Sequence, residues 1–147
     1  MTDVFDVAAF ILKECGPVPA MKLHRLTYYC QAWSLVWDDT PLFPQPVEAW
    51  ANGPVVRELY ESHRGTYLIS ELPGGDPDAL DQVQQETVRA VLDYYGDKPS
   101  QWLTDLTHIE YLWKTARSGL SDMVRGDRVI GLDTMAEYYG SLPAERE

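Results

Sequence analysis

The sequence lacks long apolar runs, metal-binding motifs and phosphate-binding loops, and each absence excludes a class of protein. No apolar run approaches the roughly 18 residues that a membrane-spanning helix needs, so we expect no membrane segment. Neither Cys-x-x-Cys nor His-Glu-x-x-His occurs, and the scattered glycines form no phosphate cradle, so we expect no metal and no cofactor. The acidic N-terminus is unlike a secretory signal, which predicts a cytoplasmic protein.

Cysteine is scarce, and the two thiols lie where helical periodicity predicts apolar positions. We interpret Cys15 and Cys30 as free thiols packed as small hydrophobic side chains, rather than as a disulfide. Cys30 could be imagined as a nucleophile with His108 as base, and the alternative from another class is a small enzyme that uses His108 and a carboxylate. A thiol within the most apolar helix is inert, so we expect no catalytic residues and no enzyme.

Basic residues are also scarce, with 12 against 23 acidic residues and a net charge of −11. Nucleic-acid binding depends on clustered Lys and Arg, which this chain lacks, so no nucleic-acid partner is expected. Between Gly65 and Trp113, nine acidic residues stand against two basic ones. This segment has two interpretations: an acidic face that binds a basic partner protein, or a solvated surface that maintains solubility.

Aromatic residues are plentiful, with five Trp and nine Tyr among the 147 residues. Each can bury roughly 150–250 Å², so they are expected to dominate the core or an interface. The length and the absence of repeats or linkers predict a single domain over 1–147, with a core of about 4–140 and a tail at 141–147.

Apolar periodicity predicts a mainly α fold, a compact bundle of six or seven helices with at most a small β-hairpin. The second helix is the clearest, because its apolar residues repeat every three or four positions: Leu23, Leu26, Cys30, Trp33 and Trp37. The other expected helices are 4–15 behind Thr2 or Asp3, one opened by Gly53-Pro54, 80–95 with Val83 in its stripe, one from Pro99-Ser100, 109–116 with Ile109, and one capped by Asp133.

Short extended segments are predicted at 47–51, at 66–69 as its pairing partner, and at 128–132. Within 47–51, Glu48 and Trp50 would share one face, because strand side chains alternate. Trp50 then either covers the core, with Lys22 or Arg25 paired to Glu48, or contacts a partner.

The segment Leu106-Thr107-His108-Ile109-Glu110 also allows two interpretations. The spacing of Thr107 and Glu110 matches a capping box at a junction between two helices. His108 and Glu110 would otherwise be a catalytic pair. Four tyrosines are candidates either for interface centres, where tyrosine is enriched, or for core packing: Tyr67, Tyr111, Tyr138 and Tyr139.

Several blocks of residues recur in an order that resembles one known family. The blocks are Lys22, Leu23, Leu26, Tyr28, Tyr29, Gln31 and Trp33; Glu48, Ala49 and Trp50; Gly53, Pro54 and Val55; Tyr60; and Thr107, His108, Glu110 and Trp113. In this order, over about 4–139, they resemble the Panacea domain, the antitoxin domain of SocA-like and phage GepA-like proteins. The resemblance implies that these motif residues are mostly structural.

The resemblance further implies a non-enzymatic antitoxin that binds a cognate toxin protein directly, and the acidic segment suits a basic toxin. The alternatives are an adaptor that delivers a toxin to a AAA+ protease, or a prophage interaction protein without a toxin. The partner-contact candidates are Trp50, Asn52, Tyr67 and Tyr111. Where this chain has Leu112, the family usually has proline, so a continuous helix is expected in place of a kink. Some relatives carry a DNA-binding domain, for which we expect no room here.

Overall fold

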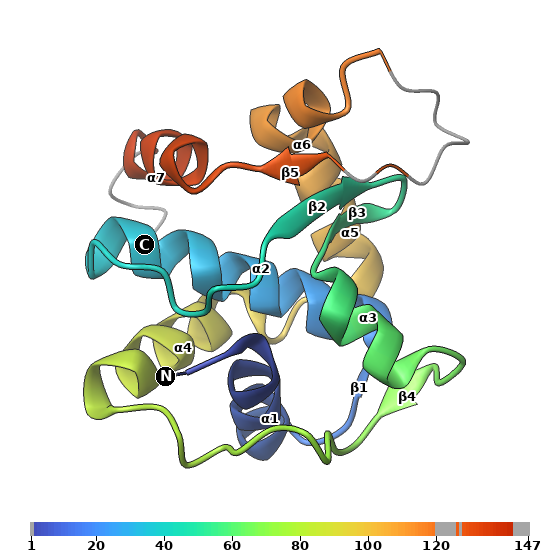
Figure 1. Ribbon diagram of the computed structural model, residues 1–147, viewed down its shortest axis with the longest axis vertical. Coiled ribbons are helices and arrows are strands. Elements are labelled where there is room, and N and C mark those ends of the chain that lie inside the picture. The colour runs from blue at the N-terminus through green and yellow to red at the C-terminus, as the bar shows by residue number, and fades with distance from the viewer. Residues whose placement is uncertain (1, 120–125, 127, 143–147) are drawn as a thin grey trace.

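A computed structural model describes residues 2–119, 126 and 128–142, with the side chain of Tyr111 excepted. Within these residues the fold is mainly helical, with seven helices and short antiparallel strands (Figure 1). The helices are α1 (Val4–Cys15), α2 (Ala20–Trp37), α3 (Arg57–His63), α4 (Gln82–Tyr95), α5 (Ser100–Ile109), α6 (Tyr111–Ala116) and α7 (Leu132–Gly140). The predicted fold class is confirmed.

Helix α2 is the centre of the fold, and it packs against α1, α4, α5 and α7. Every residue from Leu23 to Ser34 is buried, so this helix has no solvent-facing side over three turns. Its polar side chains must therefore find partners inside the protein. Gln31 does so by binding the loop that follows: its side chain donates to the Phe43 carbonyl at 2.9 Å and accepts from the Leu42 amide at 2.7 Å.

Two helices begin with side-chain caps, of which only the one at α1 was predicted from the sequence. Asp3 accepts hydrogen bonds from the Phe5 and Asp6 amides and forms a capping box with Asp6 at the start of α1. Asp81 and Gln84 form the same reciprocal pair at the start of α4. Each cap satisfies amides that the first helical turn leaves without a partner.

The strands form two small antiparallel sheets. In one, the order is β3–β2–β5, from β3 (Gly53–Val55), β2 (Val47–Trp50) and β5 (Val129–Ile130). In the other, β1 (Val18–Pro19) pairs with β4 (Leu68–Ile69). The extended segments predicted near 47–51 and 128–132 are confirmed, whereas the strand within 66–69 pairs with β1 instead of β2.

Gly53-Pro54 was expected to open a helix, and this prediction is wrong. Both residues lie in β3, and α3 begins only at Arg57, with Val56 at its N-cap. Strand β3 lies at the edge of its sheet, where a proline without an amide proton is tolerated. Proline at the start of a helix and proline in an edge strand follow the same local preferences, so contacts with α2 decide the outcome.

The predicted junction between α5 and α6 also differs from the structure. Thr107 lies inside α5 and its hydroxyl donates to the Thr104 carbonyl at 2.8 Å, so it forms no capping box with Glu110. Glu110 is extended (φ −76°, ψ 141°) and separates the two helices. The helix is continuous at Leu112, as expected, because α6 runs through this residue; the break lies two residues earlier, where the Glu110 side chain enters the core.

Several apolar positions lie at the ends of helices and are less buried than the periodicity predicts. Both thiols are free, but only Cys30 is packed in the core, whereas Cys15 is exposed at the end of α1. Val83, in the first turn of α4, and Ile109, at the end of α5, are mostly exposed. Asp133 was expected as a cap, yet α7 begins at Leu132 after Gly131 and has no side-chain cap. Asp133 instead lies in the first turn, where it favours the helix dipole.

Replacing Gly53 tests how closely the turn after β2 approaches α2. Gly53 has φ +132°, and a Cβ added there would lie 2.6 Å from Cζ of Arg25. We expect Gly53→Ala to reduce the free energy of unfolding by about 2 kcal/mol or more, because it combines backbone strain with a collision. Urea denaturation measures this. The control is Gly74→Ala, where the new methyl group meets nothing within 4 Å. Equal midpoints for both variants would contradict the packing described here.

Candidate functional site

Arg25 fixes the hairpin of β2 and β3 onto α2. The side chain is fully buried, and its guanidinium donates to the carbonyls of Pro54, at 2.8 Å, and Asn52. No ion pair links Arg25 to an acidic residue in the described part of the chain, so the pairing with Glu48 predicted for Arg25 or Lys22 is wrong. Burial lowers the pKa of Arg25 to about 10. Backbone carbonyl dipoles thus take the place of a counterion.

Glu48 and Trp50 do share one face of β2, where they meet α3. Glu48 accepts hydrogen bonds from Trp50 Nε1 at 2.8 Å and from Arg57 Nη2 at 2.9 Å. The Arg57 guanidinium also lies 5.3 Å from the centre of the Trp50 ring, and the Tyr60 ring meets Trp50 edge-on at 5.0 Å. Trp50 is only 6% exposed, so it covers the core and offers little surface to a partner.

The other side of β2 is held by α6 and the residue after it. Trp113 Nε1 donates to the Trp50 carbonyl at 2.8 Å, and Arg117 donates to the Ala49 carbonyl at 3.0 Å. His108 stacks flat on the Trp113 ring, with ring centres 4.1 Å apart. These contacts make His108 part of the packing that positions the hairpin.

A buried carboxylate joins α2, α7 and the break between α5 and α6. Glu110, which is 4% exposed, accepts hydrogen bonds from the hydroxyls of Tyr29 and Tyr139, both at 2.8 Å. The Tyr28 and Tyr139 hydroxyls lie 2.9 Å apart. Burial, together with the nearby Glu110 carboxylate, raises the pKa of Tyr29 and Tyr139 well above that of free tyrosine. This cluster places Tyr139 in the core, with its hydroxyl bonded to Glu110.

The residues that carry the family resemblance therefore meet around α2 and the hairpin. The family described as "Antitoxin SocA-like, Panacea domain" matches residues 23–114. The chain belongs to this Panacea family. The comparisons with curated proteins and with solved structures gave no match.

In this Panacea domain the motif residues are buried or half-buried. Of the partner-contact candidates, Asn52 is exposed in the turn between β2 and β3, and Tyr67 is 74% exposed beside the exposed Leu68. Trp50 is buried, and the side chain of Tyr111 lies outside the described residues. Among the candidates with described side chains, Asn52 and Tyr67 are therefore the exposed ones.

The acidic segment of the Panacea domain is largely at the surface. Eight of its nine acidic residues are exposed and only Glu110 is buried. Its two basic residues have acidic neighbours: Arg89 bonds to Glu14 at 3.0 Å and Lys98 lies 3.8 Å from Asp97. The surface of this segment therefore presents a surplus of carboxylates.

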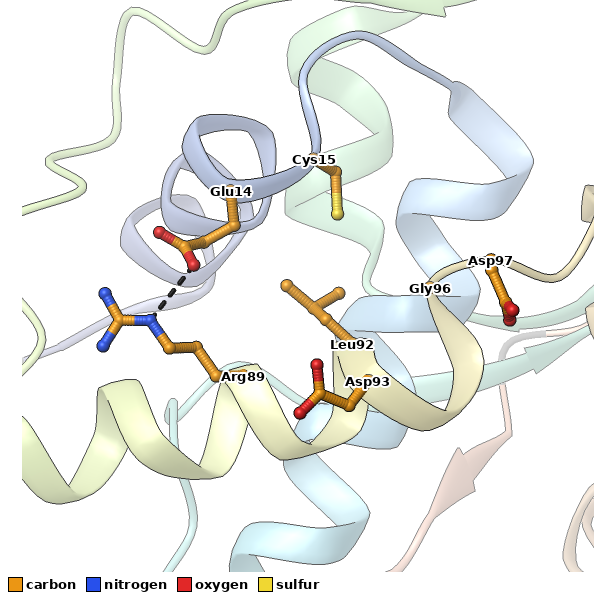
Figure 2. Close-up of a pocket in the computed structure, with 7 residues that line it drawn as sticks. All are labelled: Glu14, Cys15, Arg89, Leu92, Asp93, Gly96 and Asp97. Carbon is orange, nitrogen blue, oxygen red and sulfur yellow. Dashed lines mark hydrogen bonds and ion pairs between the residues drawn. The ribbon is translucent and has the colours of Figure 1, made fainter.

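A cleft of about 450 Å³ opens beside this acidic segment, between the C-terminal ends of α1 and α4 (Figure 2). It is lined by Glu14, Cys15, Arg89, Leu92, Asp93, Gly96 and Asp97. Asp93 makes no ion pair with any described residue. Two helix C-termini add partial negative charge, so the cleft attracts cations. The charge imbalance indicated an acidic face, but the cleft depends on how α1 packs against α4 and has no signal in the sequence.

The described residues contain neither a group of three or more metal-ligating side chains nor a helix long and apolar enough to cross a membrane. Cys30 is completely buried, and burial raises its pKa, so its sulfur remains a thiol instead of a thiolate nucleophile. Cys15 is accessible, but partial burial raises its pKa as well.

Removing one hydroxyl from the tyrosine cluster tests its contribution to stability. Tyr29→Phe leaves the ring stacked on Tyr95 but removes one of the hydrogen bonds to Glu110. We expect a loss of about 1–3 kcal/mol in the free energy of unfolding, because a buried carboxylate loses a donor. The control Tyr67→Phe removes an exposed hydroxyl and should leave the urea midpoint unchanged. A Tyr29→Phe variant as stable as the parent protein would show that Glu110 does not need this donor.

Proposed function

We propose that this protein is a non-enzymatic antitoxin that binds a cognate toxin protein and neutralises it directly. Membership of the Panacea family supports an antitoxin-like role. Neutralisation by binding needs no catalytic residues, since a bound protein can cover the active surface of a toxin or hold it in an inactive shape. The motif residues then serve to build a rigid scaffold.

The toxin we propose is a basic protein, and the acidic cleft between α1 and α4 is its first anchor. The observation that carries this proposal is Asp93, an exposed carboxylate without an ionic partner in the described chain, at the edge of that cleft. An arginine or lysine side chain of the toxin would enter the cleft and bind Asp93 and Asp97. Opposite charges also steer the encounter and raise the association rate.

The contact must extend beyond the cleft, because stable protein interfaces bury about 800 Å² on each partner. The exposed carboxylates that precede α4 continue the same charge along the chain: Glu71, Asp76, Asp78 and Asp81. A toxin with a basic face could therefore lie along this loop and α4 together. Exposed apolar residues such as Trp102 on α5 would add contact area.

Co-expression with the gene adjacent to this one tests the antitoxin role. The neighbouring gene is induced alone and then with this protein, and both growth and neighbour abundance are followed. Growth rescue at undiminished abundance supports direct neutralisation. Rescue accompanied by a fall in abundance favours the adaptor that delivers its toxin to a AAA+ protease. A neighbour that is harmless alone would contradict the proposal.

A charge reversal in the cleft tests where the toxin binds. We expect Asp93→Lys to weaken binding of the purified toxin about tenfold or more, because a like charge replaces an attractive one. The control Glu137→Lys makes the same change on α7, which lies away from α1 and α4 (Figure 1). Isothermal titration calorimetry measures both.

The same binding should weaken as salt rises, since ions screen exposed charges beyond about 10 Å at 0.1 M. Equal loss for both variants, or binding independent of salt, would contradict an acidic interface. In that case the growth test alone would decide the antitoxin role.

A further inference from the structure

Two histidines from different helices share a hydrogen bond in the interior. The Nε2 atoms of His24 in α2 and His63 at the end of α3 lie 2.7 Å apart. Both residues are buried, with exposed fractions of 5% and 8%. At this distance one Nε2 carries a proton and donates to the other, which accepts. The pair can form this bond only while at least one ring is neutral.

The outer nitrogens of both rings have no side-chain partner in the described part of the chain. Nδ1 of His24 and Nδ1 of His63 are buried without a hydrogen bond. Metal-binding histidines normally donate this second nitrogen to a carboxylate, a carbonyl or water, so the pair lacks the support of a metal site. The pair is better suited to respond to protons, because a proton added at Nδ1 of the donor ring or at Nε2 of the acceptor ring creates a buried cation.

Apart from the backbone of His63 itself, which favours the protonated form of that ring, the described surroundings offer no compensation for such a charge. Arg25, already cationic, adjoins His24 on α2, and Tyr60 of α3 contacts both imidazole rings, at 6.4 and 5.7 Å between ring centres. Within the described chain, no carboxylate oxygen lies within 4.0 Å of either histidine. The two acidic residues of α3, Glu58 and Glu61, are exposed on its outer side. Burial lowers the pKa of both histidines, and for His24 the charges of His63 and Arg25 lower it further.

Helix α3 is attached by few side chains besides His63. It has seven residues, of which only Leu59 and His63 are buried. At its edge, Arg57 bonds to Glu48 and Tyr60 packs on Trp50. Segments with few buried contacts open at lower free energy than the core, so α3 is poised to open locally.

We propose that His24 and His63 form a proton-sensitive latch that holds α3 on α2, and that acidification releases α3 while α2 remains folded. Release would separate Arg57 from Glu48 and Tyr60 from Trp50, which loosens the outer face of the hairpin. This inference rests on the histidine pair alone and does not depend on the proposed antitoxin function.

The direction of the pH effect on the opening of α3 follows from proton linkage. Both histidines are neutral when the latch is closed, whereas in the open segment they have the ordinary pKa of about 6.5. The open form therefore binds more protons below this pH. The latch is at full strength above about pH 6.5 and weakens as the pH falls towards the lowered pKa values. Between about pH 7.5 and pH 5.5, each histidine that stays neutral while closed shifts the equilibrium about tenfold towards the open form, or about a hundredfold for two.

Amide hydrogen exchange of the full chain tests the latch. After correction for intrinsic rates, we expect protection of the α3 amides to fall between about tenfold and a hundredfold from about pH 7.5 to pH 5.5. The amides of Leu23–Ser34 in α2 should keep their protection. Unchanged protection in α3, or an equal loss in α2, would overturn the proposal.

Two variants and one spectrum complete the test. The double variant His24→Gln and His63→Gln keeps amide groups that can bond but cannot titrate, so its α3 protection should not vary with pH. The control His108→Gln should keep the full loss. If the double variant does not fold, histidine NMR of the unmodified protein decides: pKa values for His24 and His63 at or above about 6.5 would overturn the latch.

Discussion

The complete burial of α2 imposes one constraint on the whole molecule: each polar side chain on this helix needs a partner that another segment supplies. His24 meets α3, Arg25 meets the hairpin, and Gln31 meets the loop at Phe43. Tyr29 meets Glu110 at the break between α5 and α6. Each bond places one neighbouring segment against the central helix. The fold is thus arranged by a row of polar contacts within an apolar core, where an unpaired group would be costly.

Local signals in the sequence predict the helices well. Periodic apolar residues identified α2 and α4, and Asp3 marked the start of α1, because these features act within one turn of helix. The errors occur where distant residues decide. Gly53 and Pro54 are extended because Arg25 binds the carbonyls around them, 27 and 29 residues away in sequence. Glu110 ends α5 with its side chain bonded to Tyr29 and Tyr139, partners that no local pattern reveals.

The candidate site shows a similar division. The sequence predicted that the motif residues would be mostly structural, and the structure places Trp50 and Glu110 in the interior. It also indicated an acidic surface, since exposed carboxylates follow from charge composition alone. The cleft escaped prediction because Glu14 and Cys15 come from α1, far in sequence from Asp93. A scaffold built from interior contacts leaves the outer surface free to differ in charge and shape, which suits a family that binds proteins.

The sheet order has a consequence for the limits of the folding unit. Strand β2 is covered on one edge by β3 and on the other by β5, and β5 leads into α7, which supplies Tyr139 to the core. The family match at residues 23–114 includes neither β5 and α7 nor α1, although α1 contributes seven buried residues. A fragment trimmed to the matched region would leave one edge of β2 open to pairing with other chains. It would also remove α1 and α7, which cover two sides of α2. We expect such a fragment to aggregate, so a shortened form of the protein should retain both flanking segments.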